Sequence, residues 1–192
     1  MPGDTNGWGD VFVRDREAGT TQRVSVGQGG VQANLYSQFG AISADGRFVV
    51  VVSAATNLVP GGSNGQWRVF VRDREAGTTQ RVCLGPHDAL PDWYSDWPTI
   101  SADGRTIAFT SGARNLVPND TNNALDVFVC DRVEGRTRRV SVGPGERQGN
   151  EDSEGAVISA DGRSIAFEST ASNLVPGDTN SAADTFVRTL VL

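Results

Sequence analysis

The sequence predicts an all-β protein with the β-propeller architecture, and two observations lead to this prediction. The stretch ISADGR begins at residues 42, 100 and 158, and NLVP begins at 57, 115 and 173, so both motifs recur every 58 residues. Each period also contains short runs of Val, Ile and Phe, separated by Gly, Asp and Asn residues that favour turns. Repeats of this length, made of short strands, indicate one four-stranded sheet, or blade, per unit.

Four strands, A to D, can be placed in each unit. Asp45-Gly46 favours a tight hairpin between strands A and B, and a turn at EAG joins strands C and D. The run FVVVV lacks alternation, which is typical of a sheet covered on both faces by neighbouring blades. The predicted groups within a single domain, residues 1–192, are 10–27 (C and D), 41–84 (A to D), 99–142 (A to D) and 157–192 (A, B and a C-like strand at 184–192).

These motifs resemble the TolB-like propeller family, whose units are also called PD40 repeats. The resemblance is carried by SADGR before an apolar strand, by VFVRD with GTTQRVS, and by NLVPGDTN. It covers essentially the whole chain and implies a propeller fold. It implies little about function, because propellers serve many unrelated roles.

The chain begins with strands C and D and ends with strands A and B, as in propellers that build one sheet from both ends. Three units are too few to close a ring. We therefore expect a homodimer with six blades, in which the N-terminal C–D pair completes the A–B pair of the other copy. The alternative is a segment of a longer propeller. Residues 10–14 and 184–188 both look like strand C, so either a fifth edge strand or an exchanged strand is needed.

Composition excludes several classes of partner. All 17 basic residues are Arg and the net charge is −6, which disfavours a nucleic-acid partner. No stretch is long and apolar enough for a membrane span. The N-terminus lacks the regions of a signal peptide, so we expect a cytoplasmic chain, or an exported chain whose leader has been removed.

The two cysteines, Cys83 and Cys130, occupy different positions of the repeat. A disulfide framework would recur with the repeat, so we expect two free thiols. A cysteine nucleophile is disfavoured because the only histidine, His87, falls in a loop.

The D–A connections are the expected binding segments. Residues 27–40, 85–98 and 143–156 differ completely, whereas the A–B turns are the same in every unit. Exposed aromatic rings beside carboxylates suit a sugar, a cationic ligand or a protein partner; packing at the ring mouth is the alternative. The candidate residues are Trp93, Tyr94, Trp97, Asp92 and Asp96, with Tyr36 and Phe39 from the neighbouring loop.

The B–C connections contain a second candidate site, for calcium. Acids and amides at positions 1, 3 and 7 resemble the start of a calcium loop, although the Glu at position 12 is missing. In the second unit Gly62 and Arg68 replace both acids. The alternative is an Asx turn. The candidate ligands are Asp4, Asn6, Asp10, Asp120, Asn122, Asp126, Asp178, Asn180 and Asp184.

The recurrent arginines indicate structural ion pairs. We expect those at positions 14, 72 and 188, and those at 23, 81 and 139, to pair with Asp15, Asp73 and Asp131.

The function that these features favour is a non-enzymatic scaffold that binds a glycan or a protein through its D–A loops. One alternative is a hydrolase, lyase or cyclase that uses Tyr and carboxylates in the central funnel, for example Asp92 with Asp96 or Glu151 with Glu154. Another is a structural unit without a ligand. A convergent polar pocket with shifted carboxylate pKa values would favour the enzyme.

Overall fold

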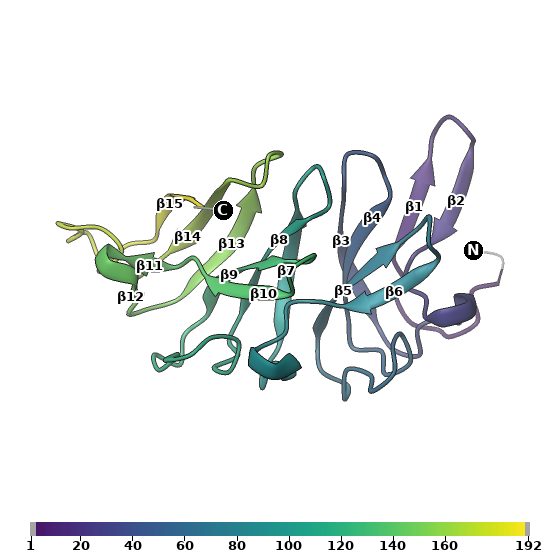
Figure 1. Ribbon diagram of the computed structural model, residues 1–192, viewed down its shortest axis with the longest axis horizontal. Helices are drawn as coiled ribbons and strands as arrows, with labels where there is room; N and C mark the ends of the chain where they lie inside the picture. The colour runs from purple at the N-terminus through teal and green to yellow at the C-terminus, as the bar shows by residue number, and fades with distance from the viewer. Residues whose placement is uncertain (1–2, 191–192) are drawn as a thin grey trace.

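Four antiparallel sheets stand side by side along the chain in the computed structural model, which describes residues 3–190 (Figure 1). The first and last sheets are incomplete, and the two between them have four strands each. The strands are β1 (Phe12–Asp15) and β2 (Thr20–Arg23); β3 (Ser37–Ile42), β4 (Phe48–Ser53), β5 (Arg68–Asp73) and β6 (Thr78–Arg81); β7 (Ser95–Ile100), β8 (Thr106–Ser111), β9 (Asp126–Asp131) and β10 (Arg136–Arg139); and β13 (Ser153–Ile158), β14 (Ser164–Ser169) and β15 (Asp184–Thr189).

Short elements connect the outer strand of one sheet to the inner strand of the next. They are three 3₁₀ turns, Gln28–Gly30, Pro86–Asp88 and Pro144–Glu146, and a minimal strand pair, β11 (Val142–Gly143) with β12 (Arg147–Gln148). In the described part of the chain, no helix has the length and hydropathy that a membrane crossing requires.

Each A–B hairpin is built by local chemistry. The Asp45 carboxylate accepts hydrogen bonds from the Ser43 hydroxyl at 2.5 Å and from the Arg47 amide at 3.0 Å. Gly46 supplies the positive φ of 74° that the turn requires. The same arrangement recurs around Asp103 and Asp161, which explains why this motif is invariant along the chain.

The core lies between the sheets. All six residues of β4 and all six of β8 are buried, so both faces of these strands are covered. Aromatic pairs add to the packing: Phe109 stacks on Phe128 with 5.6 Å between ring centroids. This double coverage is the physical reason why the sequence FVVVV lacks an alternating pattern.

The inner strands β3, β7 and β13 lie next to one another. The Thr99 hydroxyl donates to the Ala156 carbonyl across 3.2 Å, and the Ala102 amide donates to the Ala160 carbonyl across 2.9 Å. These strands start earlier than the sequence suggested. Residues 37–40, 95–98 and 153–156, which we assigned to loops, belong to the sheets.

The last sheet uses the C-like segment as a true third strand. Phe186 of β15 faces Phe167 of β14, as Phe128 faces Phe109 one unit earlier. Residues 191 and 192 of that segment lie outside the described range. At the other end, β1 and β2 form a sheet of their own, which packs through Val24 on the first complete sheet.

The recurrent Asp–Arg pair involves different arginines from those predicted. Asp73 pairs with Arg47 of the A–B turn at 2.8 Å, and Asp131 pairs with Arg105 at 2.8 Å. The arginine that precedes Asp73, Arg72, donates instead to the Thr79 hydroxyl. The expected pairing was wrong because consecutive residues of a strand point to opposite faces.

We expect Asp73→Asn to lower the free energy of unfolding at pH 7 by about 1 kcal/mol, since the pair is partly exposed. Hydrogen bonds from Arg47 lower the pKa of Asp73 to about 2. The stabilisation is therefore present above the unfolded pKa of about 3.9 and lost as the pH falls towards 2. Urea unfolding between pH 2 and 7 measures this loss.

The matched control is Asp15→Asn. Asp15 makes the same turn hydrogen bonds, to Glu17 and Ala18, but has no arginine partner within residues 3–190. Equal losses in the two variants would show that the Arg47 pair contributes nothing.

Candidate functional site

The candidate site lies where the inner strands begin. Tyr36 and Tyr94 directly precede β3 and β7, at equivalent positions of the repeat. Each inner strand then has a β-bulge, and its register shifts at Phe39, at Trp97 and at Gly155 in the three sheets. Bulges redirect side chains near binding sites.

The bulge residues have a left-handed backbone. Their φ values are 44° for Phe39, 47° for Trp97 and 68° for Gly155. Glycine adopts this region without strain, whereas a bulky residue there costs on the order of 1–3 kcal/mol. Two of the three units therefore have a strained aromatic residue at the bulge, whereas the third has an unstrained glycine.

The aromatic residues here are largely exposed. The exposed fraction is 48% for Phe39, 41% for Trp97, 49% for Tyr36 and 52% for Trp93. They lie outside the core of the described chain, and packing at the mouth of a completed ring stays the alternative. We call Tyr36, Phe39, Trp93, Tyr94 and Trp97 the aromatic surface.

Glycines allow two of these rings to lie flat on the scaffold. A Cβ on Gly9 would approach Tyr36 to 3.1 Å, and a Cβ on Gly112 would approach Trp93 to 3.1 Å. Trp8 meets Tyr36 edge-on with 5.0 Å between centroids, and Trp93 meets Tyr94 at 5.7 Å. Trp8, which the sequence analysis did not single out because it lies in a B–C loop, contacts the aromatic surface through Tyr36.

Carboxylates border the aromatic surface. Asp96 and Glu154 hold equivalent positions in β7 and β13, beside the bulges. Burial raises the pKa of Asp96. Burial also raises the pKa of Tyr94, and the charges of Asp152, Asp96 and Glu154 raise it further. Three acids from two sheets therefore act on one phenol.

Asp92 is exposed, and it also makes hydrogen bonds to the loop that follows β8. Its carboxylate accepts the Arg114 amide at 2.8 Å, and its own amide donates to the Asn115 side chain. Asn34 holds the equivalent place and makes the equivalent bonds to residues 56 and 57. Asp92 is thus a side chain that ties two loops together.

Two of the three predicted calcium loops, those of Asp4–Asp10 and Asp120–Asp126, contact an arginine. Arg139 lies 3.2 Å from Asp120 and 3.5 Å from Asp126, and Arg23 contacts Asp4 and Asp10 in the same way. The hydroxyls of Ser141 and Ser25 donate to the inner acid of each pair. The guanidinium thus occupies the place where we predicted a cation.

The amides of these loops act as Asx turns. The Asn6 oxygen accepts the Trp8 amide, the Asn122 oxygen accepts the Ala124 amide, and the Asn180 oxygen accepts the Ala182 amide. Within residues 3–190, no three His, Cys, Asp or Glu side chains cluster as metal ligands would. The geometry therefore fits the alternative of structural turns.

The second unit departs from this pattern at two coupled positions. Arg68 stands where the other units have Asp10 and Asp126, and Cys83 stands where they have the serine that bonds that Asp. Arg68 is buried and donates to the Trp93 carbonyl. An arginine in the scaffold thus holds the backbone of the aromatic surface.

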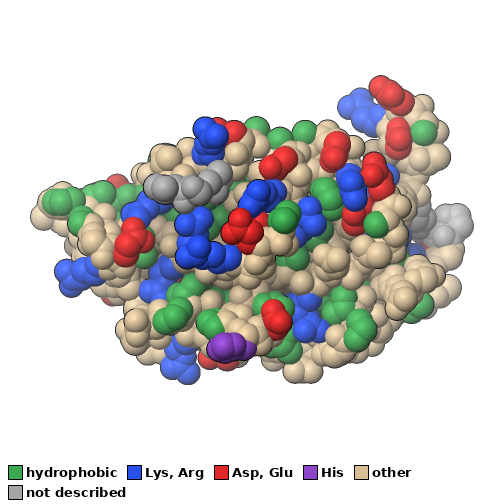
Figure 2. Space-filling model, viewed as in Figure 1, with side chains coloured by type: hydrophobic (Ala, Val, Ile, Leu, Met, Phe, Trp, Pro, Cys, Tyr) green, Lys and Arg blue, Asp and Glu red, His purple; other side chains and the backbone are tan. Residues whose placement is uncertain are grey.

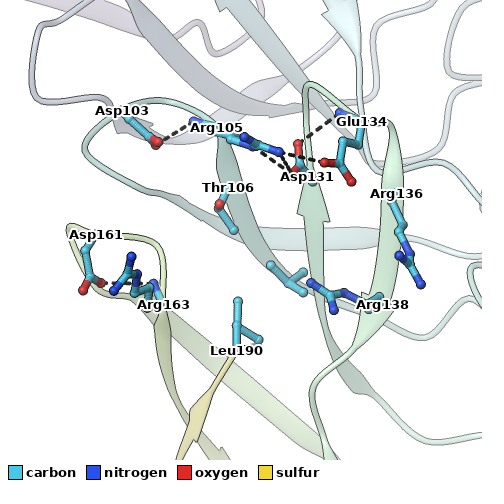
Figure 3. A pocket seen from close by; sticks show the side chains of 11 residues that line it. Asp103, Arg105, Thr106, Asp131, Glu134, Arg136, Arg138, Asp161, Arg163 and Leu190 are labelled. Atoms are coloured by element: carbon cyan, nitrogen blue, oxygen red, sulfur yellow. Dashed lines mark hydrogen bonds and ion pairs between the residues drawn. The ribbon is translucent and has the colours of Figure 1, made fainter. Parts of the chain in front are cut away.

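A recess of about 580 Å³ opens at the opposite end of the sheets, between the β7–β10 sheet and the last sheet (Figure 3). It is lined by Arg105 with its partners Asp131 and Glu134, and by Leu190. Leu190 holds the position of Arg132, whose guanidinium lies 4.0 Å from the Phe48 ring centroid in the neighbouring sheet. The recess therefore lies where the last sheet has the shorter Leu190 in place of an arginine.

Charge on the face seen in Figure 2 is mixed. Blue and red side chains alternate over the centre of that face, and no broad patch of one sign covers it. This distribution offers no continuous basic track for a nucleic acid.

Comparison with known proteins identifies the fold. No family model matches the chain, and no curated protein matches it. The putative TolB from Agrobacterium tumefaciens matches with a TM-score of 0.54 and 14% identity, over 95% of this chain and 66% of that one. The oligogalacturonate lyase of Vibrio parahaemolyticus matches with a TM-score of 0.54 and 13% identity, over 97% and 47%. The tricorn protease matches with a TM-score of 0.51 and 14% identity, over 83% and 13%.

The structural neighbours are thus TolB and related β-propeller proteins, and the expected fold is confirmed at that level. The chain spans less than two thirds of each neighbour. Identities this low concern the fold alone.

We expect neither added Ca²⁺ nor a chelator to shift the thermal midpoint, because Arg139 and Arg23 already neutralise the acid pairs. Differential scanning fluorimetry with 5 mM CaCl₂ or EDTA (about a thousandfold above a typical sensor-site Kd) checks this. A rise of several degrees with Ca²⁺ would contradict the arginine assignment.

Proposed function

We propose that the chain is a non-enzymatic binding module whose ligand is a glycan held on the aromatic surface. The observation that carries this proposal is the strained backbone of Phe39 and Trp97, which holds two exposed rings at equivalent bulges. Backbone strain that persists at exposed positions is typical of functional sites. Flat, exposed aromatic rings suit the apolar faces of sugars.

The negative charges of the chain limit which glycans can bind. Asp96, Asp152 and Glu154 lie around Tyr94, and the whole chain carries a net charge of −6. Like charges in the two partners oppose association. We therefore infer a neutral or amino-sugar glycan. The lyase among the structural neighbours is named for oligogalacturonate, an acidic polymer, which this surface would repel.

Catalysis in the same place is the second candidate. The pKa values of Tyr94 and Asp96 are both raised, and a phenol beside carboxylates is a possible acid–base pair. Such an enzyme would cleave the bound glycan, whereas a binding module would leave it intact. Mass spectrometry of the recovered glycan separates the two, with Asp96→Asn as the inactive control. A protein that neither binds nor cleaves glycans would fit the structural alternative.

We expect Trp97→Gly to weaken glycan binding about tenfold, as the loss of one aromatic contact implies. Glycine is the residue that the third unit has at this position, Gly155, so the substitution also relieves strain. The thermal midpoint should stay equal or rise. Isothermal titration with chito-oligosaccharides, glucosamine oligomers and oligogalacturonates measures the affinities.

Val133→Ala is the matched control, because Val133 is an exposed apolar residue of a C–D turn at the opposite end of the sheets. Unchanged affinity in Trp97→Gly, or tighter binding of oligogalacturonate than of the neutral oligomer, would refute the proposal.

We also propose that a second copy completes the ring, which gives six blades. The last sheet has no strand D among the described residues, and the first has no strands A and B. Strands β1 and β15 have nearly the same sequence, DVFVR and DTFVR. The hairpin of β1 and β2 from one copy can therefore replace β15 on β14 of the other, and it brings strand D with it.

Side-chain partners favour this exchange. The hairpin arrives with Arg23 and Ser25 already bonded to Asp10. In β15 the equivalent Asp184 bonds only to Asn180 within the described chain, and no arginine reaches it. Placing a carboxylate between sheets without a cation is costly, so β1 is the better third strand.

We expect light scattering on a size-exclusion column to give about twice the chain mass of 20.3 kDa. A cysteine trap tests the register, because Ala166 of β14 faces Val187 in the chain itself and would face Val13 of a second copy. In a Cys83→Ser, Cys130→Ser background, the pair Val13→Cys with Ala166→Cys should give a covalent dimer.

The pair Val187→Cys with Ala166→Cys is the control: it should form an intramolecular disulfide only if β15 keeps its place on β14, and it should stay reduced in the exchanged dimer. A monomeric mass, together with no dimer from the first pair, would exclude the exchange without affecting the glycan proposal.

A further inference from the structure

The two cysteines of the chain lie against each other, although they belong to different repeats. Cys83 follows β6 and Cys130 lies in β9 of the next sheet, and both are buried in one apolar cluster. Thr137, which faces Cys130 in the β9–β10 ladder, donates its hydroxyl to the carbonyl of Leu84 at 2.8 Å. Each thiol also shifts the pKa of the other, as close neighbours do.

Both cysteines are departures from the repeat. Cys83 replaces the serine of the other units, whose hydroxyl serves an Asp that the second unit lacks. Cys130 replaces an arginine. One unit later that arginine, Arg188, donates to the Val142 carbonyl of the preceding sheet at 3.1 Å. The thiol pair therefore stands where the last unit has a polar contact between sheets, whereas the equivalent Arg72 bonds to Thr79 within its own sheet.

We propose that Cys83 and Cys130 form a modification site, a dithiol that a peroxide oxidises to a disulfide joining the two complete sheets. In the first step a Cys thiolate attacks a peroxide oxygen, which gives a sulfenic acid and, from hydrogen peroxide, one water. In the second step the other thiol attacks the sulfenic sulfur. The S–S bond forms, a second water leaves, and two electrons in total pass from the sulfurs to the peroxide.

The surroundings assign a role to each sulfur. The hydrogen bond from Cys83 lowers the pKa of Cys130, whereas burial raises the pKa of Cys83 well above its usual value. A thiol with a lowered pKa supplies the reactive thiolate. Cys130 is therefore the attacking thiol, and Cys83 is the thiol that resolves the sulfenic acid.

The bond would link positions 83 and 130 and so constrain the unfolded chain between them. Disulfides that close loops of this size stabilise the folded state, and we expect the thermal midpoint to rise by about 5–10 °C. Since both thiols are buried, oxidation requires local opening of the sheet interface. We therefore expect it to be slower than oxidation of an exposed thiol.

The experiment treats the whole chain with hydrogen peroxide, unfolds it, alkylates it with N-ethylmaleimide and measures the intact mass. The expected product has lost two hydrogen atoms, takes up no alkylating agent and remains monomeric by covalent mass. A peptide digest should contain the Cys83–Cys130 link. Dithiothreitol should restore two reactive thiols and reverse the rise in thermal midpoint.

Two variants serve as controls. Cys83→Ser introduces the residue that the other units carry at this position, and it should trap Cys130 as a sulfenic acid that reacts with dimedone. Cys130→Ala should leave Cys83 reduced under the same treatment. Two alkylated thiols after peroxide, or disulfides only between chains, would overturn the proposal. So would oxidation of each cysteine at the same rate with and without the other.

Discussion

Every other feature of the structure depends on the face-to-face packing of the sheets. Strands β4 and β8 are buried on both sides, and in the apolar β4 a single sheet would expose two hydrophobic faces to water. Stacking buries both faces, and it places the inner strands β3, β7 and β13 side by side. The positions of the loops at each end follow from this stack. In the incomplete last sheet, Asp184 bonds to Asn180 and, within the described residues, has no arginine of the kind that contacts Asp10 and Asp126.

Residues at equivalent positions of the repeat make equivalent contacts in this fold. Positions that differ from the repeat can therefore be recognised. Asp45, Asp103 and Asp161 build three identical turns. Phe39 and Trp97 instead occupy the left-handed bulge position at which the third unit has Gly155, the residue that adopts this backbone without strain. Aromatic residues at these two positions are not required by the scaffold, because the third inner strand forms the same bulge without one. This contrast is the physical basis for assigning the aromatic surface to a ligand.

The carboxylate pairs of the B–C loops also repeat from unit to unit, with one departure in the second unit. A pair of buried carboxylates needs a cation, and either a metal or a guanidinium satisfies that need. Strand D of the same sheet delivers Arg139 to Asp120 and Asp126. In the second unit the first acid becomes Gly62, the second becomes Arg68, and the serine becomes Cys83. Cys83 therefore has no Asp partner of the kind that Ser25 and Ser141 have, and its thiol lies next to Cys130.

The period, the strands and the turn chemistry could be predicted from the sequence, because hairpins such as Asp45-Gly46 and apolar strands are encoded within a few residues. The sequence also indicated the fold and several residues of the aromatic surface. Which side chains contact each other across the sheets could be learned only from the three-dimensional structure. It placed Arg47 rather than Arg72 on Asp73, Arg139 beside Asp120 and Asp126, and Cys83 against Cys130. Those contacts join residues tens of positions apart, and their geometry depends on how one sheet packs on the next, which no local pattern records.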